Sequence, residues 1–362
     1  IRASEPKYFM EVPPDPDRRV ISKKDHMNLY RSTGVANGHG FGFVDQAERK
    51  ASNGFASYYS FSPRPGVRYI SIDTTSEGGT VLVSDRGNLD DPQYQWLERE
   101  LKEATAKNEI AIVFSHHAPG SMTAGIPDES APSCANVDPA AAPGCDGDPR
   151  DSTPIHEGSE VAALLLRYPV AVAWVAGHSH ENEVTPFVAP GGETGFWSIR
   201  TAALADWPKQ NRLIQIFDNR DGNLSLFGTV IDHAAKVEAP VDGTDAANLG
   251  TDELASLSRA VGFNDNQSGG DACAPTRCGE GEVEDRNVEL LIADPRKPQA
   301  NLNKVTVTPN SRQLGAGKQF KLTVKESNYI TATPDAKNVR VRIKSSNGRE
   351  KVKSQDLIAK IQ

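Results

Sequence analysis

Apolar runs and amphipathic stretches alternate in the middle of the chain. The runs Val67–Asp73, Glu109–His117 and Val170–Gly177 predict buried strands. Between them, Asp90–Lys107 and Ser159–Tyr168 repeat apolar residues at a spacing of three and four, which predicts two helices. Strand, helix, strand, helix, strand is typical of a mostly parallel sheet, so the chain belongs to the α/β class.

Local signals mark where the two helices begin and end. Asp90 or Asp91 can cap the first helix and Pro92 suits its first turn, whereas Pro169 ends the second. Each helix also has one apolar face, and the residues on these faces are Leu97, Leu101 and Ala104 in the first and Val161, Leu164, Leu165 and Tyr168 in the second. Both helices therefore have a surface on which to pack.

Three more apolar stretches follow the last buried strand. They are Gly195–Ala202, Arg212–Asp218 and Leu224–Ile231. The turn between the last two contains an Asp-Gly pair, which is a strong hairpin signal. We expect the sheet to continue with antiparallel strands and this first unit to end near His233.

The remainder of the chain has a different composition. Residues 234–300 are acidic and rich in Gly, Asn and Asp, which predicts a linker or surface wrap with one short helix at Thr251–Val261. Apolar and polar residues then alternate in three stretches, Lys304–Pro309, Lys318–Glu326 and Asn338–Ser345. We therefore expect three parts: residues 1–233, a linker over 234–300 and a small β-sandwich over 301–362.

Charge and hydropathy limit the possible partners of the protein. The 362 residues carry a formal net charge of −8 and form no basic stripe, so we expect no nucleic-acid partner. No apolar run approaches the roughly 18 residues that span a bilayer, so we expect no transmembrane segment.

The four cysteines form two local pairs in loop-like sequence. Cys134 and Cys145 flank one segment, and Cys273 and Cys278 flank another. Local disulfides are the favoured interpretation, and they imply an oxidising compartment, so the protein is expected to be secreted or cell-surface. A four-cysteine zinc site is the alternative, although neither pair has Cys-x-x-Cys spacing.

Four of the eight histidines lie at the ends of two predicted parallel strands. They are His116 and His117 after one strand and His178 and His180 after the next. Sites in open α/β sheets form beyond the carboxyl ends of strands, and imidazole is the commonest neutral metal ligand. The pattern predicts a metal site, with hydrogen-bonded structural histidines as the alternative. In a strand, His178 and His180 would project to the same face, whereas in a turn after the strand they could splay and serve two ions.

The His-x-His pair does not fit two other kinds of metal site, because of the residues that follow it and its late position in the chain. A metallo-β-lactamase-like site needs Asp and His at positions that hold Asn182 and Glu183 here. Barrel amidohydrolases carry the pair near the start of the fold, whereas here it comes late.

The segments VFSHHAP (Val113–Pro119) and VAGHSHEN (Val175–Asn182) together resemble the late motifs of the calcineurin-like metallophosphoesterase family, in the family's order. Further segments resemble a secreted bacterial branch of that family: EPKYFMEV, GHGFGF, YYSFSPRPGVRYISID and FWSIRTAALADWPKQNRLIQI. The resemblance covers about Glu5 to His233.

The resemblance implies a fold, an activity and a set of ligands. The fold would be the C-terminal half of an α/β/β/α sandwich with a mixed sheet, followed by a small all-β, Ig-like module. The activity would be hydrolysis of a small phosphoester by a hydroxide that two metal ions, Mn, Fe or Zn, activate. His116 would be a metal ligand, His178 would bind one metal and His180 the other. His117 would either take the ligand role of His116 or lie behind it without binding a metal. The second of these positions is favoured.

The early motifs of the family are absent before Val67. These are Asp-x-His, Gly-Asp-x-x-Asp and Gly-Asn-His-Asp/Glu, which supply carboxylates and a proton donor. The nearest segment, Ala36–Phe41, makes His39 a catalytic candidate. We therefore expect the native polypeptide to continue upstream of Ile1 with the N-terminal half of the domain. The alternative is a non-catalytic secreted module that binds or supports other molecules.

Several residues outside the His motifs also receive a prediction. The long segment Ala118–His156 is predicted to form a clipped lid or substrate wall, or else a surface insertion. His156 is expected at the start of the second helix. Asp206 and Trp207 could line the pocket, although packing is the favoured role for Trp207.

Overall fold

A computed structural model describes residues 23–31, 40–75, 86–125, 150, 153–192, 194–238, 245–264, 279–297, 306–308 and 323–325. Its centre is a six-stranded mixed sheet with the strand order β1-β2-β3-β4-β6-β5. The strands are β1 (Tyr59–Arg64), β2 (Val67–Ser71), β3 (Ile110–Phe114), β4 (Ala171–Ala176), β5 (Glu183–Val188) and β6 (Gly195–Arg200). Strands β2, β3, β4 and β6 are parallel, and β1 and β5 run antiparallel at the two edges.

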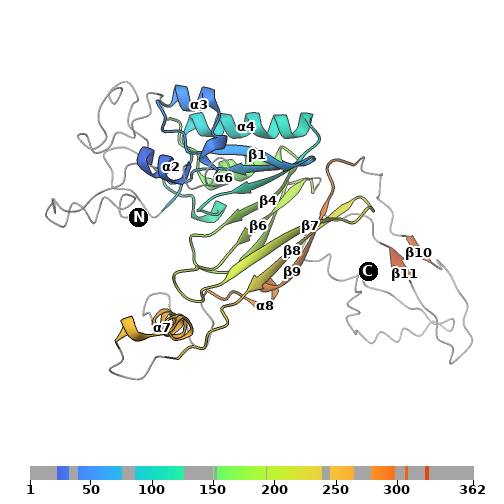
Figure 1. Cartoon of the computed structure of the whole chain (residues 1–362). Helices are drawn as coiled ribbons and strands as arrows, with labels where there is room; N and C mark the ends of the chain where they lie inside the picture. Colours follow the sequence, from blue (N-terminus) through green and yellow to red (C-terminus); the bar gives the residue numbers. More distant parts are fainter. Residues whose placement is uncertain are drawn as a thin grey trace, which may run out of the picture.

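Helices cover one face of this sheet, as Figure 1 shows for α3 (Gln46–Ala51) and α4 (Asp91–Ala106). Asp90 caps α4 by accepting the backbone N–H of Gln93, and Pro92 lies in its first turn, as predicted. The predicted face of α4 is fully buried, as is that of α6 (Gly158–Leu166) up to Leu165. These faces pack on strand residues such as Ile70, Val113 and Trp174.

A second, antiparallel sheet packs on the other face. It consists of β7 (Asn211–Asp218), β8 (Asn223–Ile231) and β9 (Val288–Ala293), in that order. Leu224, Leu226, Leu290 and Ile292 of this sheet join Ile110, Ile112 and Val172 of the first sheet in one apolar cluster. The described fold is therefore mixed α/β, with a helical layer and two sheets.

Further helices and strands are described in the rest of the chain. They are α2 (Lys23–Arg31), η2 (Phe41–Phe43), η3 (Pro119–Ser121), η4 (Ala246–Asn248), α7 (Thr251–Phe263), α8 (Val283–Arg286), β10 (Thr306–Thr308) and β11 (Thr323–Lys325). α7 confirms the predicted short helix. β10 and β11 pair antiparallel and fall in the first two stretches of the predicted β-sandwich, while the third lies outside the described residues.

Two expectations about the late strands were wrong. β6 does not extend the sheet antiparallel, because it lies parallel to β4 and the unpredicted strand β5 pairs with its other edge. The predicted hairpin of β7 and β8 is confirmed, but it belongs to the second sheet. The apolar run of β9, in the stretch 234–300 that we expected to be mostly coil, pairs with β8 and completes this sheet.

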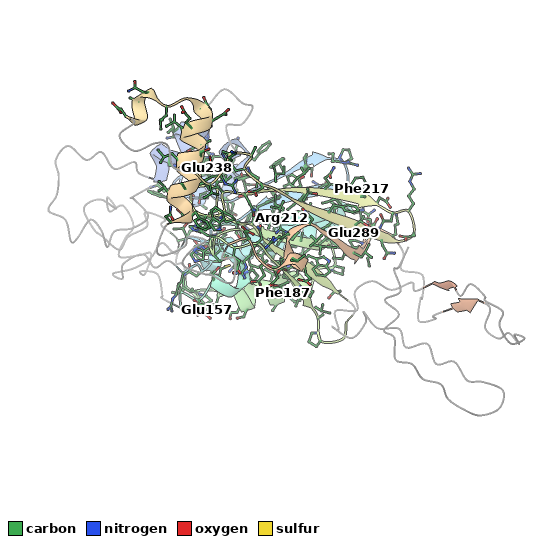
Figure 2. The ribbon with its side chains drawn as sticks, turned by 90° about the horizontal axis from the view of Figure 1, so that it is seen from below. Glu157, Phe187, Arg212, Phe217, Glu238 and Glu289 are labelled. Atoms are coloured by element: carbon green, nitrogen blue, oxygen red, sulfur yellow. The ribbon has the colours of Figure 1, made fainter. Side chains whose placement is uncertain are left out.

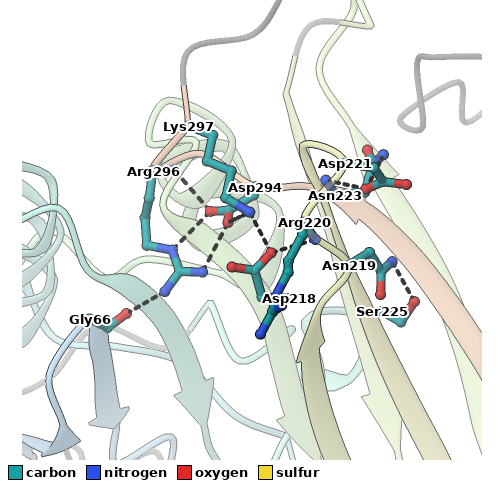
Figure 3. Close-up of polar contacts among 10 residues, drawn as sticks. All are labelled: Gly66, Asp218, Asn219, Arg220, Asp221, Asn223, Ser225, Asp294, Arg296 and Lys297. Atoms are coloured by element: carbon teal, nitrogen blue, oxygen red, sulfur yellow. Dashed lines mark hydrogen bonds and ion pairs between the residues drawn. The ribbon is translucent and has the colours of Figure 1, made fainter.

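A polar cluster joins the two sheets at the end where β2 begins (Figure 3). Asp294, which is 1% exposed, accepts two hydrogen bonds from the Arg296 guanidinium at 2.8 and 2.9 Å. The same guanidinium donates to the Gly66 carbonyl at 3.4 Å in the turn between β1 and β2. The Arg296 side chain therefore attaches the chain after β9 to the backbone of the β1–β2 turn, in addition to the apolar packing between the sheets.

The outer face of the second sheet carries exposed apolar side chains. Leu213 and Phe217 on β7 and Ile231 on β8 are 47%, 49% and 50% exposed. Figure 2 shows Phe217 and Glu289 on strands of this sheet, with Arg212 nearer the centre of the molecule. No helix in the described part of the chain has the length and apolar character to cross a membrane.

Candidate metal centre

Two neighbouring parallel strands bring the histidine motifs together. Beyond the ends of β3 and β4 the backbones remain paired, because Ser115 N–H donates to Val175 at 3.1 Å and Gly177 N–H donates to the His116 carbonyl at 3.0 Å. His116 and His178 therefore leave the same edge of the sheet side by side. This is the juxtaposition that the strand pattern predicts.

Three histidines form one cluster at this edge. A possible ligand atom of each of His116, His117 and His178 lies within 4.8 Å of those of the other two. The Nε2 atom of His116 is 3.1 Å from Nδ1 of His178. The ring centroid of His117 is 4.7 Å from that of His116 and 4.3 Å from that of His178. The three rings therefore converge on one volume.

This geometry fits a transition-metal ion. Nitrogen ligands lie about 2.0–2.1 Å from zinc, so two neighbouring ligands of one ion are about 3 Å apart. The separation of 3.1 Å between His116 and His178 agrees with that spacing. Imidazole suits zinc, iron, copper and nickel alike, so the donor type does not select one metal. Within the described residues this cluster contains no carboxylate.

The surroundings of His116 favour the neutral ring that a metal requires. Although the residue is exposed on one side, desolvation by the protein lowers the pKa of His116, and the nearby His178 and His180 lower it further. The carboxylate of Asp73 acts in the opposite direction on this pKa. Asp73 follows β2, and its carboxylate accepts hydrogen bonds from the Ser57 hydroxyl and the Thr75 N–H.

His117 is fixed from behind by Thr74. The Thr74 hydroxyl accepts the backbone N–H of His117 at 3.1 Å and lies 2.9 Å from its Nδ1. Both residues are buried, at 1% and 4% exposure. Gly87 leaves room for the ring, because a Cβ at that position would lie 2.7 Å from His117 and 2.8 Å from the Thr74 carbonyl oxygen. The Nδ1 edge of His117 therefore faces the protein.

The Gly-His-Ser-His turn separates its two histidines. His178 and His180 both have left-handed backbones, with φ of 74° and 55°. Non-glycine residues adopt this conformation at a cost of roughly 1–3 kcal/mol, and such residues concentrate at functional sites. His178 faces His116 and His117, whereas Nδ1 of His180 lies 2.8 Å from the Asp206 carboxylate. The two histidines therefore splay, which is one of the two predicted arrangements.

The other predicted residues have simpler positions. His156 stacks on Tyr94 with ring centroids 3.8 Å apart, and its two ring nitrogens face Asp91 and Glu160, which confirms its place at the start of α6. Trp207 is 5% exposed and packs on Phe263, as expected. His39, the four cysteines and most of Ala118–His156 lie outside the described residues.

A cavity of about 420 Å³ lies near the start of α6. Its walls come from both ends of the long segment and from the helix start, namely Gly125, Thr153, Pro154, Ile155, Glu157, Ser159 and Glu160. None of the clustered histidines lines it, so this cavity does not belong to the histidine cluster.

Of the comparisons with known proteins, the one with solved structures gives matches. No protein-family model matches the chain, and no curated protein matches it. Among the solved structures that match is the crystal structure of a dimetal phosphatase from Danio rerio, with 16% identity and a TM-score of 0.28. The match covers 49% of this chain and 60% of that protein, so the chain spans less than two thirds of its length. A TM-score this low does not establish a shared fold.

Proposed function

We propose that this chain supplies histidine ligands to the metal centre of a phosphoester hydrolase. The observation that carries the proposal is the convergence of His116, His117 and His178 at the ends of two adjacent parallel strands. The sequence resemblance of the two segments that hold these residues supports phosphoester chemistry. The 3.1 Å separation of His116 Nε2 and His178 Nδ1 also fits an N–H···N hydrogen bond between two structural histidines, so a metal measurement decides between the two interpretations.

The four histidines have different roles at the proposed metal centre. His116 and His178 bind one ion through the nitrogens that lie 3.1 Å apart. His117 lies beside them with its Nδ1 against Thr74. Its ring packs behind the two rings that bind the first ion. His180, turned toward Asp206, serves the second ion.

Neutral imidazoles alone do not offset the charge of two divalent cations. We propose that the remaining carboxylates and the proton donor come from an upstream half of the same polypeptide. When bound, the two ions supply Lewis acidity toward the phosphoryl oxygens and lower the pKa of a coordinated water. This chain's residues hold and orient the ions, and the substrate is a small phosphoester.

Turnover with and without metal tests this function. The native polypeptide is stripped with a chelator, reloaded with Mn²⁺, Zn²⁺ or Fe²⁺, and assayed with a phosphomonoester and a phosphodiester. We expect metal-dependent hydrolysis of at least one substrate, and a loss of at least 100-fold in His178→Ala. Chelator-resistant hydrolysis, or unchanged turnover in His178→Ala, would refute the proposal.

A second candidate is a non-catalytic extracellular module. The absence of a carboxylate from the three-histidine cluster, as far as the structure describes it, favours this alternative. Metal binding without turnover of either phosphoester by the native polypeptide would select it.

The rest of the chain adds two smaller proposals. The local pairs Cys134–Cys145 and Cys273–Cys278 support a secreted or cell-surface protein with two disulfides. The alternating pattern of residues 301–362 supports a β-sandwich module. Mass spectrometry of peptides from non-reduced protein tests the first, and expression of residues 301–362 alone tests the second.

A further inference from the structure

Buried contacts fix the positions of both His180 and Asp206, although an ion pair between two such exposed side chains adds little to the stability of the fold. Nδ1 of His180 lies 2.8 Å from Oδ2 of Asp206, and each side chain is 43% exposed. Ion pairs this exposed contribute little to the free energy of folding. The two residues nevertheless come from different turns, one after β4 and one between β6 and β7, and buried contacts fix both turns.

Asn182 joins the two turns. It is 1% exposed and lies two residues after His180. Its Oδ1 accepts the backbone N–H of Ala202 at 3.2 Å, and its Nδ2 donates to Oε1 of Gln210 at 2.8 Å. Ala202 and Gln210 lie on opposite sides of Asp206 in the β6–β7 loop. One buried amide therefore fixes this loop relative to the His180 turn.

Gly279 supports both turns from behind. Its carbonyl accepts the Asn182 N–H at 3.0 Å, and its φ is 77°. A Cβ at this position would lie 2.8 Å from the His180 carbonyl oxygen and 2.9 Å from that of Trp207. Gly279 thus lies against the backbone on both sides of the His180–Asp206 contact, and only glycine fits there.

Trp207 anchors the Asp206 side of the contact. Its ring is 5% exposed, packs edge-on against Phe263 at 5.0 Å and lies beneath the Arg259 guanidinium at 5.6 Å. The residue after Asp206 is therefore fixed to α7. Asp206 has little freedom to move away from His180.

We propose that Asp206 is a positioning residue, which accepts the Nδ1 proton of His180 and leaves Nε2 as the ligand atom for the second ion. That Nε2 binds a metal ion rests on the proposed function, whereas the choice of tautomer does not. A carboxylate on one ring nitrogen determines which tautomer a histidine adopts, and such partners strengthen metal binding by 10- to 100-fold.

Nearby acidic residues offer a matched control. Glu183 is paired with Arg200, so its carboxylate is engaged. Glu181 is exposed, lies beside His180 in the same turn, and forms no ion pair within the described residues. Glu181→Ala removes one negative charge from beside His180, as Asp206→Ala does, but leaves the His180–Asp206 contact in place.

The tautomer is measured on metal-free native polypeptide with ¹⁵N-labelled histidine, by nuclear magnetic resonance at pH 8. We expect the His180 proton on Nδ1 in the wild type and in Glu181→Ala, and a shift toward the Nε2–H form in Asp206→Ala. Asp206→Asn, which keeps an accepting oxygen and the shape of the side chain, should retain the Nδ1–H form. An unchanged tautomer in Asp206→Ala overturns the proposal, whatever the phosphoesterase assays give.

Titration with Zn²⁺ and Mn²⁺ then measures the consequence for binding. We expect Asp206→Ala to weaken one of two binding events by 10- to 100-fold and Glu181→Ala to change neither by more than about 3-fold. Equal affinities in wild type and Asp206→Ala would overturn the link to the metal. No binding by wild type, with the tautomer shift present, would refute the proposed function and leave the positioning role of Asp206 in place.

Discussion

Nε2 of His116 lies 3.1 Å from Nδ1 of His178, although 62 residues separate them in the chain. The parallel pairing of β3 with β4 produces this contact, and it continues past both strands through the Gly177 N–H and the His116 carbonyl. The cluster is therefore a product of sheet topology. Substitutions that shift the strand ends should disturb it without touching a histidine.

Thr74→Val should loosen His117. The change keeps the shape of the side chain but removes the hydroxyl that accepts the buried His117 N–H and contacts its ring. An unsatisfied buried donor costs about 1–3 kcal/mol, so we expect a loss of that size in the free energy of unfolding. Metal affinity should also fall. Thr74→Ser keeps the hydroxyl and should behave like wild type in urea unfolding; equal losses in both variants would refute this role.

Gly87→Ala should displace the His117 ring. The new methyl group would lie within 3 Å of both the ring and the Thr74 carbonyl oxygen, which is backbone and cannot swing aside. Overpacking of this kind costs about 1–3 kcal/mol. Gly120→Ala is the control, because a Cβ at Gly120 meets nothing within 4 Å. We expect thermal unfolding to separate the two variants, and indistinguishable midpoints would contradict the packing described for His117.

Asp294→Asn should weaken the joint between the two sheets. The change leaves the Arg296 guanidinium without its charged partner, and breaking a fully buried ion pair costs 3–5 kcal/mol. Because Arg296 is 21% exposed, we expect a smaller loss of about 2–3 kcal/mol in denaturant unfolding at pH 7. Lys297→Met removes a partly exposed partner of the same cluster and should cost less. A greater loss of unfolding free energy in Lys297→Met than in Asp294→Asn would show that Asp294 is not the residue that joins the two sheets.

The same pair should contribute to acid unfolding. Burial alone would raise the pKa of Asp294, but hydrogen bonds and charge from Arg296, with Lys297, hold it below the usual value. The unfolded chain therefore binds a proton at higher pH than the folded one, so this stabilisation is present above about pH 4 and is lost as the pH falls below it. Between pH 4 and pH 2, stability should fall less steeply in Asp294→Asn than in wild type. Parallel pH curves would contradict this assignment.

The sequence predicts the centre of the fold well because its signals there are local. Asp90, Pro92 and the apolar face of α4 determine one helix without help from distant residues. The sequence does not predict how the late strands are arranged. Nothing in the apolar run of β6 indicates that β5 lies beyond it, and β9 follows a long acidic stretch that resembles a linker. Pairing partners depend on burial in the whole molecule.

The candidate site also has a part that the sequence predicts and a part that it does not. The meeting of His116 with His178 follows from two strand ends in a parallel sheet, and the sequence is sufficient for it. Thr74, Gly87 and Gly279 carry no signal of their own, because their roles come from close approaches between segments remote in the chain. The position of Thr74 just after a strand was the one available hint.

The metal content of the native polypeptide tests the central claim most directly. After purification without chelator, elemental analysis should find at least one equivalent of Mn, Fe or Zn per chain in wild type. His233→Ala, which changes an exposed histidine outside the cluster, should retain that metal. His178→Ala should lose most of it while keeping the wild-type circular dichroism spectrum. Wild type that holds no metal, even after incubation with each ion, or His178→Ala that holds as much as wild type, would contradict the account.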